Sequence, residues 1–300
     1  MSTTRSAPTV PRPAAPEEAL FTLPEAFRLD GARALVTGAS RGIGRACAET
    51  LAAAGCDLVL SARTTGALAA TLDAVEGMGR KAVGLAADLG ERGAAADLAE
   101  RAAHALGGLD VLVHNAGTLP TAADATPVVA PFHTSDQAQW ETVLSVNLNA
   151  TAELCRAAHP HLAASPRAAL VLMSSVAGLI GTPMMEAYAA SKAAQVSLGR
   201  SLAVAWARQG IRVNVLCPGW IRTDMTGFAA DAAPVSDWLM SHVPMGRWGE
   251  PADVARAALF LASAASSYMT GHALVLDGGL SVPDGGLAGI PKPPSPFTAP

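Results

Sequence analysis

The stretch ALVTGASRGIGRACAETLAAAGCDLVLSAR, residues 34–63, decides the fold of this chain. A short apolar run ends in a turn that contains Gly38, Gly42 and Gly44, and an alanine-rich stretch and a second apolar run follow it. This order predicts a strand, a helix and a second strand. Glycine has no Cβ, so these positions permit both a tight turn and the close approach of a ligand to the backbone.

The start of the predicted helix is suited to binding phosphate. Its free N–H groups and its dipole both favour a pyrophosphate. A glycine-rich turn alone also fits a purely structural role. Here the turn lies between a strand and a helix, and a second strand follows, which favours a dinucleotide-binding unit.

Arg63 follows the second predicted strand, where a dinucleotide-binding fold faces the adenosine ribose. An acidic residue there accepts hydrogen bonds from the free 2′-hydroxyl of NAD, whereas a cation suits the 2′-phosphate of NADP. The sequence offers Ser61, Ala62 and Arg63, without a carboxylate, and Arg41 in the glycine turn could reach the same phosphate. Guanidinium forks suit phosphate oxygens. The pattern predicts NADP(H) as cofactor, with two solvated surface arginines as the alternative.

Apolar runs alternate with alanine-rich helical stretches along the chain. The runs cover residues 32–37, 57–61, 81–86, 110–114, 169–174, 212–216 and 273–276. Near-continuous apolar strands between helices predict a parallel sheet covered on both faces, and right-handed crossovers make it doubly wound. We expect one α/β domain over residues 27–280, a Pro-rich, mostly disordered or loosely docked arm over 1–26 and an irregular Pro-rich tail over 281–300.

Composition argues against several classes of function. The net charge of -4 and the pI near 6.0 disfavour electrostatic binding of nucleic acid. Cys47, Cys56, Cys155 and Cys217 are far apart and lack the pairing of a metal site, as expected of free thiols in a reducing cytoplasm. The N-terminus lacks the apolar core of a secretory signal, and the longest uncharged stretch is broken by Gly and Pro. We therefore expect a cytoplasmic protein with no metal and no membrane span.

Tyr188 and Lys192 are four residues apart in a helical pattern, so they share a face of the helix. A free tyrosine has a pKa near ~10 and is a poor base at neutral pH. A nearby ammonium stabilises the phenolate and lowers that pKa. The pair therefore predicts an acid–base site, although an ordinary amphipathic helix has the same spacing.

Ser175 strengthens the catalytic interpretation of that pair. It ends the apolar run ALVLMSS, and the carboxyl edge of a parallel sheet is where such folds bind ligands. There it can hydrogen-bond a substrate carbonyl while Tyr188 donates a proton. Asn147 supplies an amide that can hold a water against Lys192, or it is a helix-surface or packing residue.

These motifs resemble those of the short-chain dehydrogenase/reductase family, in particular its 3-oxoacyl-acyl-carrier-protein reductase-like, ketoreductase-like members. The resemblance covers about residues 29–280. It rests on TGASRGIG (37–44), NAG (115–117), the set Asn147, Ser175, Tyr188 and Lys192, PGWIRTDM (218–225), and the C-terminal stretches RWGEPADVARAALFLAS and LVLDGG. The resemblance implies a single doubly wound Rossmann domain with a seven-stranded parallel sheet, in a homotetramer.

The resemblance also assigns roles to residues. Tyr188 would be the acid–base residue and Ser175 would polarise the carbonyl, while Lys192 would orient the ribose and lower the pKa of Tyr188. Asn147 would position a relay water. The implied NADP(H)-binding set is Gly38, Ser40, Arg41, Gly42, Ile43, Gly44, Arg63, Asp88, Leu89, Asn115, Ala116, Gly117, Tyr188, Lys192, Pro218, Gly219, Ile221 and Thr223.

The walls of the expected cleft suggest a substrate with apolar parts. Met184, Met185 and Trp220 are expected to face it, and soft or aromatic walls suit apolar groups. Residues 118–140 form a long predicted loop at its border, in which His133 is either a substrate contact or a solvated histidine. Residues 226–247 are expected to close over the substrate, with a fixed surface helix as the alternative.

Three functions fit the sequence. The first is an NADP(H)-dependent oxidoreductase that interconverts an acyl, cyclic or aryl ketone and a secondary alcohol. The second is a sugar-acid or polyol dehydrogenase, which the lack of an evident charged cluster in the cleft disfavours. The third is a non-catalytic dinucleotide-sensing scaffold, which has no need of Tyr188 and Lys192 together.

Overall fold

The computed structural model describes residues 24–122 and 126–283, with residues 292, 294 and 296. Most of the predicted N-terminal arm and C-terminal tail therefore lies outside the described residues. The ring of Phe27 lies 6.4 Å from that of Phe260, so the packed domain includes residue 27.

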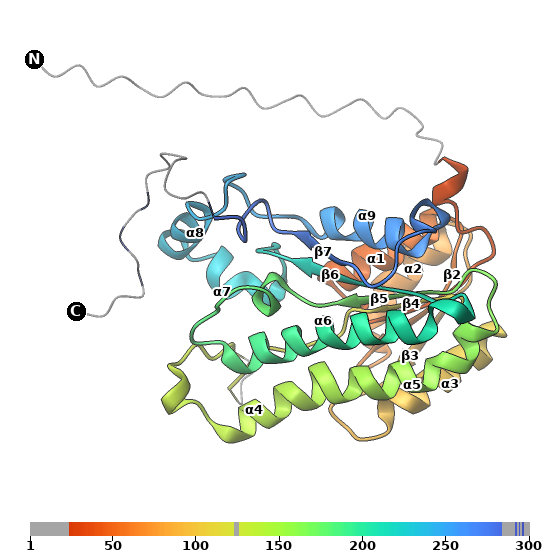
Figure 1. Ribbon diagram of the computed structural model, residues 1–300, viewed down its shortest axis with the longest axis horizontal. Helices are drawn as coiled ribbons and strands as arrows, with labels where there is room; N and C mark the ends of the chain where they lie inside the picture. Colours follow the sequence, from red (N-terminus) through yellow and green to blue (C-terminus); the bar gives the residue numbers. More distant parts are fainter. Residues whose placement is uncertain (1–23, 123–125, 284–291, 293, 295, 297–300) are drawn as a thin grey trace, which may run out of the picture.

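The domain is built on a seven-stranded sheet in which every neighbouring pair is parallel (Figure 1), as the sequence predicted. The strand order is β3-β2-β1-β4-β5-β6-β7. The strands are β1 (Arg33–Thr37), β2 (Asp57–Ala62), β3 (Ala82–Ala86), β4 (Val111–His114), β5 (Ala169–Met173), β6 (Arg212–Pro218) and β7 (Ala273–Leu276). Each lies where an apolar run predicted it, with ends that differ by at most two residues.

Helices cover both faces of the sheet, which is why its strands are apolar throughout rather than alternating. One face packs on α1 (Gly42–Ala53), α2 (Ala69–Gly77) and α9 (Pro251–Ala262). The other packs on α3 (Ala94–Leu106), α5 (Ala150–Ala163) and α6 (Glu186–Trp206). Figure 1 shows the two layers above and below the sheet, with α4 (Gln137–Leu144), α7 (Gly227–Ala230) and α8 (Ala233–Met240) toward one end.

The strand order positions the site. The chain leaves β1 for β2 and β3 on one side and returns to β4 on the other, so the order reverses between β1 and β4. In doubly wound sheets, ligands bind outside the carboxyl ends of the strands at this reversal. Because all strands are parallel, the segments that follow β1, β4, β5 and β6 all leave the sheet at this edge.

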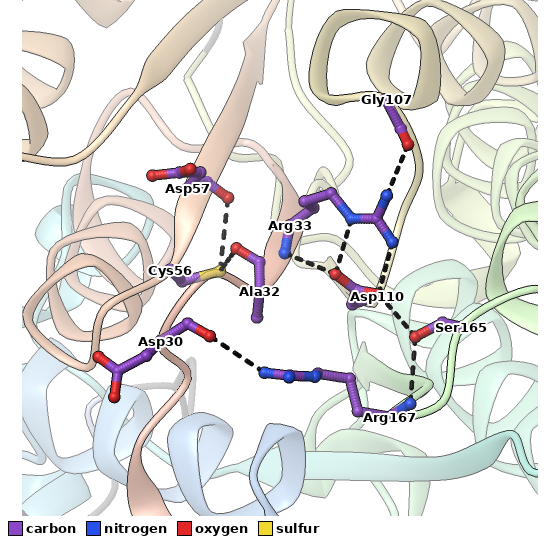
Figure 2. A network of polar contacts seen from close by, with 9 residues as sticks. All are labelled: Asp30, Ala32, Arg33, Cys56, Asp57, Gly107, Asp110, Ser165 and Arg167. Carbon is purple, nitrogen blue, oxygen red and sulfur yellow. Dashed lines mark hydrogen bonds and ion pairs between the residues drawn. The ribbon is translucent and has the colours of Figure 1, made fainter.

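The opposite edge is held by a polar network centred on Asp110, directly before β4 (Figure 2). Arg33 donates from Nε to Oδ2 of Asp110 and from Nη2 to Oδ1, both at 2.8 Å. Ser165 donates to Oδ1 at 2.6 Å, and the backbone N–H of Arg167 donates to Ser165 Oγ at 3.2 Å. Burial alone would raise the pKa of Asp110, but the hydrogen bonds from Arg33 and Ser165 outweigh it and hold the pKa below its ordinary value.

We expect Asp110→Asn to lower the free energy of unfolding by about 2 kcal/mol at neutral pH, because Arg33 would face a neutral amide instead of a carboxylate. A carboxyl with a lowered folded-state pKa contributes stability above its unfolded pKa and loses it as pH falls through the folded pKa. The difference between wild type and variant should therefore shrink in acid, as measured by urea unfolding.

Asp97→Asn is the matched control. Asp97 and Arg101 form an exposed ion pair at 2.8 Å on α3, and such pairs contribute little. Equal losses of stability for Asp97→Asn and Asp110→Asn would contradict this assignment.

In the described part of the chain, no helix is long and apolar enough to cross a membrane. The same part contains no group of three or more His, Cys, Asp and Glu side chains placed to hold a metal ion.

Candidate active site

The glycine turn after β1 is compact because α1 begins directly against it. Gly38 has a φ of +64°, in the left-handed region that favours glycine. A Cβ on Gly44 would overlap the carbonyl oxygen of Gly38 and lie 2.6 Å from Asn115 Nδ2, so no side chain fits there. Asn115 donates from Nδ2 to the carbonyl oxygens of Thr37 and Gly38, at 3.2 and 3.1 Å. The segment after β4 thus braces the turn after β1.

The start of α1 is open to a ligand. Its N-cap residue, Arg41, makes no side-chain capping hydrogen bond to the helix. The Arg41 guanidinium instead lies 3.1 Å from Asp224, and both side chains are about two-thirds exposed. An exposed pair of this kind is worth little, so a phosphate could replace the carboxylate at low cost. Arg63 is also exposed, directly after β2.

The remaining predicted cofactor residues lie along the same edge. Asp88 is exposed, and its Oδ1 accepts from the N–H of Gly90 at 2.9 Å, while the neighbouring Leu89 is buried. Ala116 donates its N–H to Thr37 Oγ1 at 3.0 Å. These placements fit the predicted NADP(H) set, which stays a prediction.

The segment after β6 reaches from the sheet to the glycine turn. A Cβ on Gly219 would lie 2.7 Å from the Cβ of Asp277, which directly follows β7. Ile221 is buried, and a Cβ on Gly42 would lie 3.3 Å from Thr223 Cγ2. The glycine turn after β1 and the segment after β6, which are far apart in sequence, thus lie side by side.

Three predicted catalytic residues lie close together at the carboxyl edge of β5 and β6. Ser175 donates from Oγ to the carbonyl oxygen of Pro218 at 3.4 Å and accepts from the N–H of Ala177 at 3.1 Å. Tyr188 lies in the first turn of α6, with the Lys192 ammonium 5.5 Å from its ring centroid. The Ser175 hydroxyl is placed to hydrogen-bond the Tyr188 phenol. The arrangement can present a proton donor and a hydrogen-bonding hydroxyl to one carbonyl oxygen.

Burial and hydrogen bonding act in opposite directions on the pKa of Tyr188. Burial raises it above its ordinary value, and the hydrogen bond with Ser175 opposes this only in part. Lys192 is 3% exposed, and burial lowers its pKa to about 8. Its ammonium donates to the carbonyl oxygen of Met173 at 2.8 Å and to Gln195 Oε1 at 3.0 Å. In the chain without ligand, desolvation thus decides the pKa of Tyr188, and its lowering by Lys192 stays a prediction.

Asn147 lies in a π-helical turn, Ser145–Asn149, between α4 and α5. Such turns are frequent at functional sites. Its side chain accepts from the N–H of Thr118 at 2.7 Å and donates to the carbonyl oxygen of Thr118 at 2.9 Å and to Ser191 Oγ at 3.0 Å. A Cβ on Gly117 would lie 3.2 Å from Asn147 Oδ1 and 3.3 Å from Lys192 Nζ, so both atoms border the same small space.

Gln195 is a residue that the sequence reasoning missed. It is fully buried and contacts both Lys192 and Asn147. The signal was available, since Gln195 is a polar residue three positions after Lys192 and therefore on the same face of the helix.

An apolar recess lies beside the start of α6. Its wall from the long loop is Pro120, Val128, Ala130, Phe132 and Trp140, and its wall from the segment before Tyr188 is Met184, Met185 and Ala187. Asp136 and Glu186 also border it. In the recess, Met184 and Met185 thus lie near Ala187, the residue directly before Tyr188.

One prediction for the long loop needs correction. Residues 137–140 form the first turn of α4, because the Asp136 side chain caps that helix by accepting from the N–H of Ala138. Residues 123–125 lie outside the described part of the loop. His133 is exposed and does not line the recess, as the solvated alternative predicted.

Residues 226–247 contain α7 and α8, which fold over their own apolar cluster. Its buried members are Ala229, Ala230, Leu239 and Trp248, with Trp220, Val235, Trp238 and Met240 packed against them. Trp220 meets Trp248 edge-on at 5.7 Å instead of lining the recess, because its ring is held inside this cluster. Closure of this segment over a substrate stays a prediction.

These features define a class of protein: a doubly wound Rossmann-type domain with a tyrosine–lysine pair at the carboxyl edge of its sheet. The family model described as Enoyl-(Acyl carrier protein) reductase matches residues 38–281. The chain therefore belongs to the short-chain dehydrogenase/reductase family, and it is an oxidoreductase.

Individual relatives align over nearly their whole length. Gluconate 5-dehydrogenase of Gluconobacter oxydans (strain 621H) is 35% identical over 86% of this chain and 98% of its own. D-threitol dehydrogenase of Mycolicibacterium smegmatis is 35% identical over 85% of this chain and 95% of its own. The structure of a gluconate 5-dehydrogenase from Burkholderia cenocepacia J2315, in complex with NADP and tartrate, is 34% identical with a TM-score of 0.79, over 86% of this chain and 98% of its own.

Proposed function

We propose that the protein interconverts a ketone and a secondary alcohol with NADP(H), using Tyr188 as the acid–base residue. The observation that carries this proposal is the buried Lys192 ammonium 5.5 Å from the centroid of the Tyr188 ring, with Ser175 held against Pro218 at the same edge of the sheet. Buried titratable groups gathered at a ligand-binding edge are typical of catalytic sites. When bound, the nicotinamide supplies the hydride.

The residues of this chain fit an NADP(H) cofactor. No side chain caps the start of α1, so its N–H groups can bind a pyrophosphate. Arg41 and Arg63 are exposed cations at the adenosine end, and residues 61–63 contain no carboxylate to pair with a free 2′-hydroxyl. NADP bound to the Burkholderia relative supports the same choice.

In the reductive direction, Ser175 donates a hydrogen bond to the ketone oxygen and Tyr188 donates a proton to it. The phenolate left behind is stabilised by the Lys192 ammonium. Lys192 also holds the nicotinamide ribose, and Asn147 fixes the chain after β4 against α6 through Thr118 and Ser191. In the oxidative direction the same phenolate accepts the proton of the alcohol.

The substrate has two candidate classes. The apolar recess at Met184 and Met185 favours a ketone with apolar parts. Relatives named gluconate 5-dehydrogenase and D-threitol dehydrogenase favour a sugar acid or polyol. Asp136 and Glu186, which border the recess, can accept hydrogen bonds from hydroxyl groups, and this suits a neutral polyol better than an anionic sugar acid.

A substrate panel with both cofactors tests this proposal. The panel contains cyclic and aryl ketones, polyols, and sugar acids with their keto forms, and NADPH formation or consumption is followed by absorbance. We expect turnover of at least one class with NADP(H), abolished in Tyr188→Phe. NADPH binding without turnover of any compound would favour the non-catalytic scaffold instead.

The homotetramer and the cytoplasmic location are proposals that the family resemblance supports. Large apolar side chains stand exposed on and beside the sheet edge, among them Val204 on α6 and Val275 on β7. Multi-angle light scattering on the purified chain measures the assembly directly, and a monomer would contradict it.

A further inference from the structure

Gln195 bridges two residues of the candidate active site. Its side chain is 0% exposed and lies three residues after Lys192 on α6. Its Oε1 accepts from Lys192 Nζ at 3.0 Å, and its Nε2 donates to the carbonyl oxygen of Asn147 at 2.8 Å. An ammonium can only donate and a carbonyl oxygen can only accept, so these two partners fix the orientation of the amide.

The bridge continues through α5 to β4 and β1. Thr151 donates from Oγ1 to the carbonyl oxygen of Asn147 at 2.7 Å and accepts from Gln195 Nε2 at 3.0 Å. The hydroxyl proton is thereby used, so His114 Nε2, 2.8 Å away, must donate to Thr151. His114 Nδ1 then accepts from Thr37 Oγ1 at 2.9 Å. The direction of every hydrogen bond in this series is therefore defined.

This arrangement fixes one acceptor of Lys192. The carbonyl oxygen of Asn147 accepts from the side chains of Gln195 and Thr151. A covalently attached amide that is fixed by buried partners holds a defined position beside the ammonium.

We propose that Gln195 is a positioning residue that holds the Lys192 ammonium beside Tyr188. The proposal rests on the proposed roles of Tyr188 and Lys192. Gln195 acts through Lys192 and does not itself touch the reacting atoms.

The groups around Lys192 allow its protonation state to be followed by the pH dependence of the rate. The titratable groups that face it are Tyr188 on its own helix, His114 on β4 and Cys217 on β6. Burial, aided by Lys192, lowers the pKa of His114 to about 3, and burial raises that of Cys217 to about 11. Between about pH 6 and about pH 10 both stay neutral, and burial raises the pKa of Tyr188 above its ordinary value, so an alkaline loss of reductive rate in this range reports Lys192.

Two substitutions at Gln195 should move the alkaline limb of the pH profile of the reductive rate in opposite directions. Gln195→Met removes an acceptor of the ammonium, so the limb should move to lower pH and the reductive kcat should fall by about tenfold or more. Gln195→Glu places a carboxylate against the ammonium, so the limb should move to higher pH. Val196→Ala, a buried truncation at the next position on α6, should lower thermal stability without moving the limb.

A second readout does not depend on turnover. The chain has two tyrosines, and Tyr268 is fully exposed. In a Tyr268→Phe background, phenolate absorbance therefore reports Tyr188 alone. Gln195→Met should shift phenolate formation to higher pH, because the ammonium that stabilises the phenolate is lost at lower pH.

The outcomes separate this proposal from the proposed function. Shifts of the limb in the same direction for both variants, or an unchanged limb and absorbance, would overturn the role of Gln195. An absorbance shift caused by Gln195→Met in the Tyr268→Phe background, together with no turnover of any ketone or alcohol by the wild type, would support the role of Gln195 and overturn the proposed function. If Gln195→Met does not fold, Gln195→Glu decides alone: a limb at or below the wild-type pH contradicts the proposal.

Discussion

Tyr188→Phe should lower kcat by about 10²–10⁴-fold, the usual contribution of a positioned acid–base group. The phenol is placed beside the Ser175 hydroxyl and the Lys192 ammonium, so its proton has a defined path to a carbonyl held by Ser175. Phenylalanine keeps the ring and its packing but has no proton to give. Folding and NADPH affinity should therefore stay near those of the wild type.

The measurement is steady-state turnover with the best substrate of the panel, together with NADPH titration and thermal unfolding. Tyr268→Phe makes the same chemical change at a fully exposed position and should leave all three values unchanged. If Tyr188→Phe kept more than about a tenth of the wild-type rate, the loss would be too small for an acid–base residue. Lys192→Ala should differ from it by losing both rate and cofactor affinity.

Arg63→Asp should reverse or erase a preference of the wild type for NADPH over NADH. A guanidinium makes charge-assisted hydrogen bonds to a 2′-phosphate, whereas a carboxylate repels that phosphate and accepts from a free 2′-hydroxyl. Removal of one such contact corresponds to roughly tenfold to hundredfold weaker NADPH binding.

Fluorescence titration with both cofactors gives the ratio of dissociation constants for wild type and variant. Arg208→Asp is the matched control, since Arg208 is an exposed arginine in the turn before β6, at the opposite edge of the sheet. A wild type that binds both cofactors equally, with a ratio unchanged in Arg63→Asp, would contradict the 2′-phosphate assignment. An equal effect of Arg208→Asp would point to bulk charge instead of a specific contact.

The parts of this protein that its sequence predicts are those set by local physics. A parallel strand covered on both faces must be apolar throughout, so the runs at residues 32–37 and 169–174 were readable without a structure. The turn at Gly38 and Gly44 was also predictable from the sequence. Where a strand passes directly into a helix, the helix packs against the turn and leaves no room for a Cβ. The spacing of Tyr188 and Lys192 follows from helical geometry alone.

Contacts between segments far apart in the chain were decided by tertiary structure. The bridge from Lys192 through Gln195 to Asn147 joins residues on α6 to the π-helical turn before α5, and no local pattern specifies which buried amide meets which carbonyl. The same holds for Trp220, whose place after β6 suggested the cleft but whose ring packs against Trp248. It also holds for the pKa of Tyr188, since the sequence supplies a neighbouring ammonium, whereas the burial that raises the pKa exists only once the layers have packed.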